Sequence, residues 1–528
     1  MRLQQRLEPR TAGAPEVARH ALERARDTGF DALLERHRAA WDATWAAADL
    51  RVDGDPEDQH ALRFAIYHMI STAHPEKDTV SIGARGLGGM SYFLHVFWDT
   101  EIFVLPFFIY TQPETALTML TYRYRNLPGA REKAARMGFR GALYPWESAD
   151  KGVETTPPYV YGPDGEQVPI LSGLMEHHIS ADVAWAVWEY WKATGDDAFM
   201  VDMGVEMLLE TARFWVSRAA EDEEGRYHVR VVVGPDEYHE GVDDNAYTNV
   251  LARWNIKRAL EALAWLDDHD RARARELRKR LKLAGRELAR WRRVMEGYVT
   301  GFDPETLLFE QFAGFYDMAD VPLERLRPRP MPADLLLGRD VTLVSKVVKQ
   351  ADVVMLCHVL ADEIDEATTR ANYDYYEPIT SHGSSLSPGI HAAVAARLHD
   401  VAEATSYFKM AAAIDLGDNM GNAAAGLHMA TMGGLWQAAV MGFCGIMRRG
   451  EALRLDPQLP AAWSCVRLPL RFRGAQLHLD LRRHGDGVDV GITVAEEPVT
   501  FRLDGVDHEL TPGAHRLRRR DGGPWRVE

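Results

Sequence analysis

The sequence contains little cysteine, no excess of positive charge and no long hydrophobic run. Its three cysteines, Cys357, Cys444 and Cys465, lack paired spacing and have apolar neighbours. We therefore expect reduced core residues rather than disulfides or metal ligands, which suits a reducing compartment. Acidic residues outnumber basic ones, 78 to 61, and the formal net charge is −17. This balance disfavours nucleic acid and anionic membrane surfaces as partners, because both need a basic footprint.

The chain also lacks the marks of a membrane or secreted protein. Its longest apolar stretch, residues 103–110, is too short to span a bilayer and contains Pro106. The N-terminal residues MRLQQRLEPRTAG show neither the apolar core nor the cleavage site of a signal peptide. With 46% hydrophobic and 26% charged residues over 528 positions, we expect a soluble, cytoplasmic protein of two or three domains.

Helical periodicity dominates the residues that are present. The segment 180–194, SADVAWAVWEYWKAT, has aromatic residues on so much of its surface that we expect a helix buried on most sides. Longer helical stretches are expected at 257–294 and 342–362. Other helices are expected near 58–73, 114–126, 204–220, 388–399, 401–413 and 430–444. Helices in pairs with polar loops between them are typical of an α/α toroid.

The pattern changes after residue 455. The run VRLPLRFRGAQLHLDLRRHGDGVDVGITV alternates apolar and polar side chains around a Gly-Asp-Gly turn at 485–487, and the alternation continues in 499–503 and 507–518. A period of two predicts antiparallel strands with one solvated face. The expected fold is therefore mainly α, with a small C-terminal antiparallel β domain.

Five carboxylates lie close together in GPDEYHEGVDDNAYTN, residues 234–249. They are Asp236, Glu237, Glu240, Asp243 and Asp244. One interpretation is a solvated acidic turn in which Asp243 or Asp244 caps the next helix. The other is a carboxylic acid among aromatic residues, whose raised pKa lets it donate a proton at neutral pH. This segment alone leaves both interpretations open.

Two tryptophans are each followed by a carboxylate. Trp98 precedes Asp99 in HVFWDTEIF, and Trp146 precedes Glu147 in PWESADKGVET. A tryptophan face can stack on a sugar ring while the carboxylate accepts from its hydroxyls, so the two pairs favour a carbohydrate ligand. Asp99 could instead cap the helix that follows, because a buried carboxylate needs a hydrogen-bond donor.

The segment TSHGSSLSPGIH, residues 380–391, supplies neutral donors ahead of a predicted helix. They come from Gly383, Ser384, Ser385 and Ser387, and His382 adds a further donor. A helix N-terminus with free N–H groups and nearby hydroxyls binds anions, although an ordinary serine-capped helix would look the same.

Lys349 and Gln350 lie in the apolar segment VSKVVKQADVVML. A lysine in a buried helix needs an anionic or polar partner, whereas a surface lysine does not. One acid, two sugar-binding pairs and an anion site together are what phosphorolysis of a glycosidic bond requires.

In these stretches the sequence resembles glycoside hydrolase family 65, the inverting phosphorylases of maltose, trehalose, kojibiose or nigerose. Seven blocks match in the family's order over residues 50–450: HVFWDTEIF, YRYRNLPGAREKA, YPWESADKGVE, GPDEYHEGVDDNAYTN, KQADVVML, TSHGSSLSPGIH and HMATMGGLWQ. The resemblance implies an (α/α)6 barrel at 51–452, after a helical linker region at 1–50 and before a β domain at 453–528.

The resemblance also implies a role for individual residues. Glu237 would be the general acid. The substrate-binding residues would be Trp98, Asp99, Lys349 and Gln350, to which the second tryptophan–carboxylate pair adds Trp146 and Glu147. The phosphate-binding residues would be His382, Ser384, Ser385 and His428. No metal and no cofactor is expected, and inorganic phosphate is the co-substrate.

In the expected reaction Glu237 protonates the glycosidic oxygen while phosphate attacks the opposite face, which yields β-glucose 1-phosphate. An inverting hydrolase needs a second carboxylate about 6.5–9.5 Å from the acid. The HGSS sequence at 382–385 contains none, which favours phosphate. An α-glucosidase that uses another carboxylate, such as Glu377, and a barrel that binds sugar without turnover stay open. The expected partners are an α-glucoside disaccharide and phosphate, and the family allows a homodimer.

The sequence departs from the family's pattern in two places. Members usually begin with a β-sandwich domain, whereas this sequence begins near the helical linker. The loop at 157–176, PPYVYGPDGEQVPILSGLME, is long for the family, and we expect it near the acceptor subsite.

Overall fold

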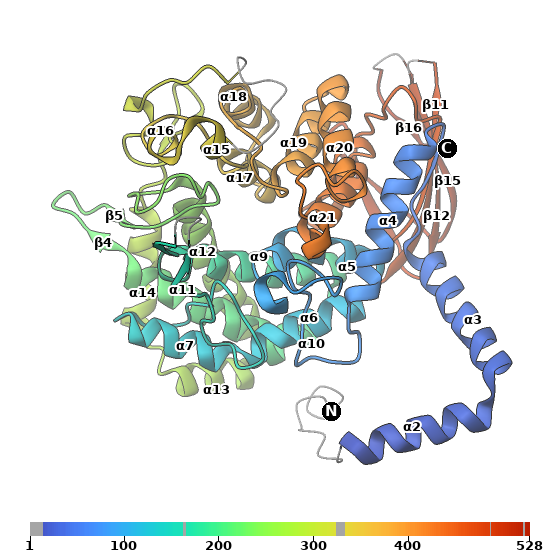
Figure 1. Ribbon diagram of the computed structural model, residues 1–528, viewed down its shortest axis with the longest axis horizontal. Helices are drawn as coiled ribbons and strands as arrows, with labels where there is room; N and C mark the ends of the chain where they lie inside the picture. Colours follow the sequence, from blue (N-terminus) through green and yellow to red (C-terminus); the bar gives the residue numbers. More distant parts are fainter. Residues whose placement is uncertain (1–13, 162–164, 324–332, 486, 521–522, 528) are drawn as a thin grey trace.

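The structure is a computed structural model that describes residues 14–161, 165–323, 333–485, 487–520 and 523–527. Paired helices form an α/α toroid, and a C-terminal β region packs beside α4 and α5 (Figure 1). This confirms the predicted fold class. The main helices of the toroid are α4 (Pro56–Thr72), α5 (Leu105–Thr111), α6 (Pro113–Arg125), α7 (Leu127–Arg136), α9 (Ile179–Thr194), α11 (Val205–Arg218), α12 (Ala246–His269), α13 (Arg271–Leu281), α14 (Gly285–Glu296), α17 (Val353–Val359), α18 (Glu366–Tyr376), α19 (Ser387–Arg397), α20 (Val401–Leu416) and α21 (Met429–Gln437).

Local sequence explains where several of these helices begin and end. The Asp55 side chain accepts hydrogen bonds from the first turn of α4, and Pro56 occupies the position where no N–H is needed. Helix α9 is buried on most sides, as its aromatic residues predict, and ends at Gly195, which has a positive φ of 72°. Asn245 caps α12 by accepting from Thr248 N. The cap of this helix is therefore neither Asp243 nor Asp244.

Two predicted helices differ from the structure. The stretch 257–294 divides into parts of three helices, because Asp270 caps α13 and Lys282 adopts a left-handed conformation. The stretch 342–362 is helical only at its first residue, where α16 (Arg339–Thr342) ends, and in α17. Its middle is not helical because Val348 N donates to Ile379 O and Lys349 N donates to Asp236. Lys349 therefore lies in a connecting segment rather than inside a buried helix.

Two sheets form the β region, as the period-two pattern predicts. One has the order β1-β10-β11-β12-β15-β16 and the other the order β14-β13-β9-β8. Their strands are β1 (Arg51–Asp53), β8 (Ile446–Arg449), β9 (Ala452–Leu455), β10 (Cys465–Phe472), β11 (Ala475–His484), β12 (Gly487–Ala495), β13 (Val499–Leu503), β14 (Val506–Leu510), β15 (Gly513–Arg519) and β16 (Arg526–Val527). Strands β1 and β8 lie outside 453–528, and the expected domain boundaries stay predictions.

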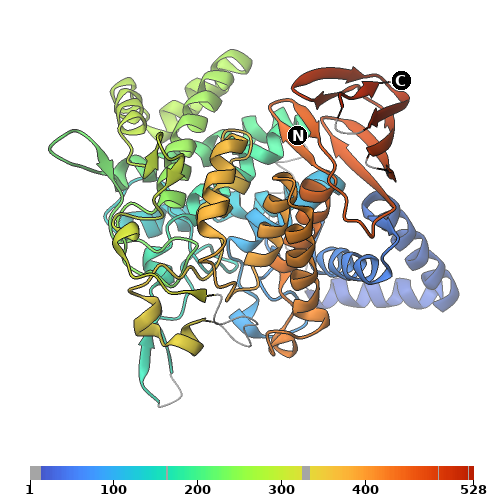
Figure 2. The ribbon, with the colours of Figure 1, turned by 90° about the horizontal axis from the view of Figure 1, so that it is seen from above.

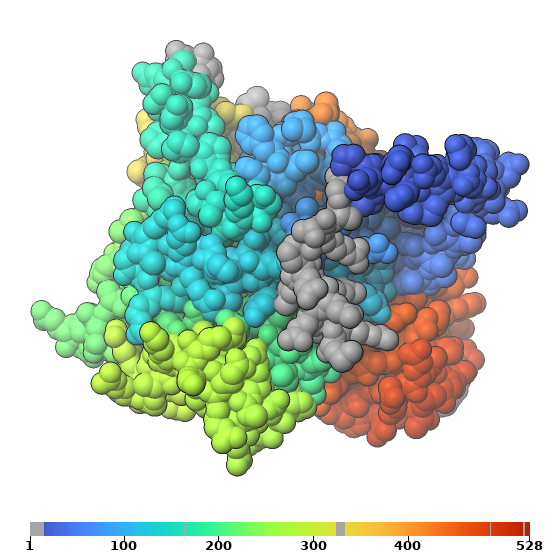
Figure 3. Space-filling view, turned by 90° about the horizontal axis from the view of Figure 1, so that it is seen from below, coloured from blue at the N-terminus to red at the C-terminus, as the bar shows by residue number. Residues whose placement is uncertain are grey.

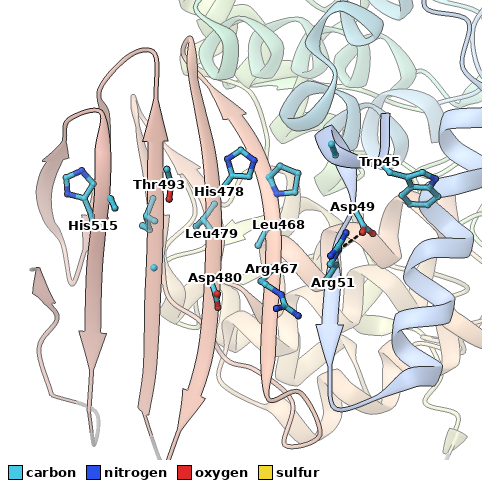
Figure 4. Close-up of a pocket in the computed structure, with 15 residues that line it drawn as sticks. Trp45, Asp49, Arg51, Arg467, Leu468, His478, Leu479, Asp480, Thr493 and His515 are labelled. Carbon is cyan, nitrogen blue, oxygen red and sulfur yellow. Dashed lines mark hydrogen bonds and ion pairs between the residues drawn. The ribbon is translucent and has the colours of Figure 1, made fainter. Parts of the chain in front are cut away.

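The outer face of the six-stranded sheet carries a hollow of about 420 Å³ (Figure 4). Trp45 borders it on one side, and strand residues such as His478 and Thr493 form its floor. None of the candidate site residues lines this hollow. The three cysteines are buried with free thiols, as expected.

Two segments project from the body of the molecule. Helices α2 (Ala14–Thr28) and α3 (Phe30–Ala48) form an arm that leads to β1 and α4 (Figure 1). The hairpin of β2 (Tyr159–Tyr161) and β3 (Gln167–Pro169) extends on the other side, within the long loop at 157–176 (Figures 2 and 3). In the described part of the chain, no helix has the length and apolar character that crossing a membrane requires.

Candidate active site

The loop that carries Glu237 is fixed by its buried neighbour Asp236. The Asp236 carboxylate accepts from Lys349 N at 2.8 Å, from Gln311 Nε2 at 2.8 Å and from His239 Nδ1 at 2.6 Å. Burial alone would raise the pKa of Asp236, but the His239 charge and these donors hold that pKa below its usual value. An ionised Asp236 therefore ties the 234–249 loop to the segment that contains Lys349.

Glu237 itself lies between the side chains of Lys349 and Gln350. Its Oε2 is 2.9 Å from Lys349 Nζ, and its Oε1 is 3.4 Å from Gln350 Nε2. Although burial opposes the charged form of Lys349, the Glu237 carboxylate raises the pKa of that lysine. The structure thus brings the predicted acid and two of the predicted substrate-binding residues together, as an ion pair with a third polar neighbour.

The two predicted tryptophans form an aromatic wall together with His178. The Trp98 ring centroid lies 6.4 Å from that of Trp146 and 4.9 Å from that of His178, and both tryptophans are buried. His178 Nδ1 is 2.7 Å from Asp182 Oδ2; burial works against the charge, but Asp182 raises the pKa of His178 to about 9. A charged imidazole therefore packs against both tryptophan rings.

The carboxyl groups of Asp99 and Glu176 lie close enough to Glu237 to interact with it electrostatically. Burial raises the pKa of Asp99 to about 7, with the Glu237 charge as a further cause. Burial also raises the pKa of Glu176 to about 7, with a contribution from Glu237. Sequence reasoning found Asp99 but missed Glu176 and His178, although both lie in LMEHHIS, where a polar cluster enters a helix of apolar residues.

The second tryptophan–carboxylate pair is held in a separate network. Glu147 Oε2 is 2.8 Å from His95 Nδ1, and the backbone N–H groups of Trp146 and Glu147 donate to Glu154. Glu154 also pairs with Lys133 at 2.5 Å. Trp146 belongs to the aromatic wall, whereas Glu147 is bonded to His95.

The 380–391 segment is bound to the segment that carries Lys349. Ser381 N donates to Val348 O at 2.6 Å, and Gly383 N donates to Lys349 O at 2.9 Å. His382 has a positive φ of 49°, and its ring nitrogens each lie 3.0 Å from a hydroxyl, Ser387 Oγ and Tyr407 Oη. The loop that carries Ser384 and Ser385 is therefore held at a fixed place relative to the acid.

His428 meets this region at the start of α21. Its Nε2 accepts from Arg85 Nη1 at 2.5 Å, so the proton lies on Nδ1, which donates to Asp415 Oδ1 at 2.7 Å. Ser385 O accepts from Thr431 Oγ1 at 2.8 Å in the same helix. Both ring nitrogens of His428 are thus engaged, and the cation that His428 orients is Arg85.

Sequence reasoning missed Arg85. It is buried, its electrostatic neighbours include Asp99 and Asp415, and its Nε has no hydrogen-bond partner within the described ranges. Burial is the main cause that lowers its pKa. A single arginine in the apolar and glycine-rich loop at 81–99 was the signal that could have identified it.

Two family models and a solved structure match most of this chain. Residues 63–437 match the model of the glycosyl hydrolase family 65 central catalytic domain, and residues 447–510 match the model of the family's C-terminal domain. A solved structure of a candidate kojibiose phosphorylase from the human microbiome superposes with a TM-score of 0.87 at 28% identity, covering 96% of this chain and 69% of that one.

Curated relatives are similar over most of this chain. A kojibiose phosphorylase of Caldanaerobacter subterraneus subsp. tengcongensis is 43% identical over 486 residues, which are 91% of this chain and 63% of the relative. An alpha,alpha-trehalose phosphorylase of Geobacillus stearothermophilus is 36% identical, with 91% and 61% covered. A nigerose phosphorylase of Lachnoclostridium phytofermentans is 33% identical, with 87% and 62% covered. The chain spans about three fifths of the length of these relatives.

Proposed function

This chain belongs to glycosyl hydrolase family 65, and on that premise we propose that it cleaves an α-linked glucoside with inorganic phosphate and releases β-glucose 1-phosphate. Glu237 protonates the glycosidic oxygen, and one phosphate oxygen forms a bond to the anomeric carbon as the glycosidic bond breaks. The acceptor sugar leaves with the proton from Glu237, which regains one from solvent or from phosphate. A single displacement of this kind inverts the anomeric centre.

The hydrogen bonds that join three loops carry this proposal. Lys349 donates through Nζ to Glu237, and its carbonyl accepts from Gly383 N. The proton donor and the serine-bearing loop are thus bound to the same residue. A proton donor and an anion site held at fixed positions are what an in-line attack by phosphate needs.

The contact between Glu237 and Lys349 places the acid and a sugar-binding group side by side. Lys349 Nζ is 2.9 Å from Glu237 Oε2. In this proposal sugar hydroxyls accept from Lys349 in place of the Glu237 carboxylate, which is then free to face the glycosidic oxygen. A general acid needs to lie within hydrogen-bond reach of the atom that it protonates.

The phosphate site in this proposal consists of His382, Ser384, Ser385 and Arg85, with His428 as the residue that orients Arg85. Arg85 supplies a buried cation, and its Nε–H is unpaired within the described ranges. A guanidinium matches two oxygens of a phosphate dianion and forms stronger bonds with it than a neutral donor does. The sugar site consists of Trp98, Asp99, Trp146, Glu147, Lys349 and Gln350.

A phosphate-dependence assay tests the reaction type. The chain is incubated with kojibiose, trehalose, nigerose and maltose, with and without phosphate, and products are identified by proton NMR. We expect β-glucose 1-phosphate only when phosphate is present, with kojibiose as the first substrate to examine because of the relative at 43% identity. Equal glucose release without phosphate would instead indicate an α-glucosidase. Binding of a sugar without turnover would indicate a sugar-binding barrel.

A further inference from the structure

A second group of cationic side chains lies where the toroid meets the four-stranded sheet. They line a pocket of about 420 Å³ between the start of α18, the end of α19 and the strands β8, β9, β13 and β15. The cationic lining residues are His399, Arg449, Arg454, Arg502 and Arg519. We use the name arginine seam for Arg449, Arg454, Arg502 and Arg519 together with the buried Arg397, which lies close enough to Arg449 and Arg454 to be repelled by their charges.

Arg397 is a buried guanidinium that makes no ion pair within the described part of the chain. It is the last residue of α19 and is 7% exposed, and its Nη2 donates to Cys357 O at 3.4 Å. Its Nε and Nη1 have no hydrogen-bond partner among the described residues. Burial, with repulsion from Arg449 and Arg454, lowers the pKa of Arg397 to about 9.

Arg449 is the second cation of the seam without an ion pair. Its side chain is half-buried, and the described ranges contain no hydrogen bond or ion pair to it. Burial and the nearby Arg454 lower its pKa. The nearby carboxylate of Asp362 is already engaged, because its Oδ2 is 3.0 Å from Arg448 Nη1.

The carboxylates that line the pocket are shared among several cations. Asp456 lies 2.7 Å from Arg454, 2.9 Å from Arg519 and 3.1 Å from His399. Asp504 is 3.5 Å from Arg519, and the Glu366 carboxylate is 3.9 Å from Arg454. Since these acids already pair with other cations, Arg397 and Arg449 have no ion pair of their own among the described residues, in a chain whose formal net charge is −17.

We propose that the arginine seam binds a phosphate monoester, such as a sugar phosphate, at a site separate from the active site. Guanidinium groups pair with phosphate oxygens through two parallel hydrogen bonds, and a dianion would balance the charges of Arg397 and Arg449. The volume lies within the range of about 300–1,000 Å³ typical of small-molecule sites.

The seam cannot be the phosphate site proposed beside Glu237. Helix α19 has 11 residues, with Ser387 next to the 382–385 loop at one end and Arg397 at the other. At a rise of ~1.5 Å per residue these ends lie ~15 Å apart, too far for one phosphate group to contact both. The proposal therefore does not depend on the function proposed above.

Calorimetric titration of the full chain with glucose 6-phosphate at low ionic strength tests the site. We expect Arg449→Gln to weaken a binding event at least about tenfold, which is about 1.4 kcal/mol. Arg275→Gln changes an exposed arginine on α13 and should leave this event unchanged. Uncharged glucose should show no difference between wild type and Arg449→Gln. Equal affinity of wild type and Arg449→Gln for glucose 6-phosphate would overturn the proposal.

The thermal stability of the same variant gives an independent measurement. Without ligand, Arg449→Gln should melt at a temperature equal to or above that of the wild type, because it removes repulsion between uncompensated cations. Glucose 6-phosphate should raise the melting temperature of the wild type and of Arg275→Gln more than that of Arg449→Gln. A variant that unfolds, or that melts below the wild type without ligand, would contradict the charge imbalance on which the site rests.

Discussion

The loops around Glu237 and the arginine seam differ in how completely their charged side chains are paired. Near the acid, Glu237 pairs with Lys349, and Asp236 accepts from three donors. At the seam one carboxylate, Asp456, serves three cations, while Arg449 has no ion pair in the described ranges. Glu237 and Asp236 thus have partners before any ligand binds, whereas Arg449 would gain an ion pair only from a bound anion. Variants that remove one partner from each region test this contrast.

The largest effect is expected from Glu237→Gln, which keeps the shape of the side chain but cannot donate the acidic proton. We expect kcat for a disaccharide with phosphate to fall by about 1,000-fold, the range of general acid catalysis. Cleavage of α-glucosyl fluoride by phosphate should fall far less, because fluoride leaves without a proton. Glu240→Gln, at an exposed ion pair with Arg339, should retain activity. Equal losses on both substrates would assign Glu237 a role other than that of the acid.

The next largest effect, on the free energy of unfolding, is expected at Asp456, the carboxylate that three cations of the pocket share. Asp456→Asn should lower the free energy of unfolding by about 3 kcal/mol at pH 7, because three cations lose their partner at once. Asp504→Asn removes a longer and more exposed contact and should cost less than about 1 kcal/mol. Urea unfolding monitored by circular dichroism measures both. Similar losses for the two variants would mean that Asp456 does not act as a shared partner.

A smaller effect is expected from a change at Arg85, the buried cation of the proposed phosphate site. Arg85→Gln should raise KM for phosphate about 30-fold, or about 2 kcal/mol, because one charged donor to the dianion is lost. KM for the disaccharide should change much less. Arg339→Gln, which changes an exposed arginine, serves as the control. If kcat fell while KM for phosphate stayed the same, Arg85 would not contact phosphate.

The contrast also explains what the sequence could and could not predict. The strands β10, β11 and β12 were predictable because alternation of apolar residues is a local property. The helix predicted at 342–362 was right only for α17, because Val348 and Lys349 use their backbone groups for distant partners, Ile379 and Asp236. Propensity cannot report such long-range bonds.

Some residues of the candidate site could likewise be predicted from local sequence, and others could not. Glu237 and Lys349 were each identified from their own segments and from the family resemblance. Their pairing with each other, across 112 positions, required the fold. Arg85 was missed because a hydrogen bond to His428, 343 positions away in the sequence, holds it at the site. The arginine seam could not be predicted from the sequence for the same reason, since its arginines come from segments that meet only in the folded chain.

The smallest expected effect is a pH dependence of stability that separates Asp99 from an ordinary surface acid. Burial raises the pKa of Asp99 to about 7 from 3.8, so the folded state holds a proton that the unfolded state releases. Stability from this group is present below pH ~4 and is lost as pH rises through ~7. Asp99→Asn cannot ionise, so its melting temperature relative to wild type should be higher at pH 8 than at pH 5. Asp150→Asn, at an exposed position, should show no such difference. A constant offset for Asp99→Asn across this range would mean that Asp99 is ionised throughout, as a surface acid would be.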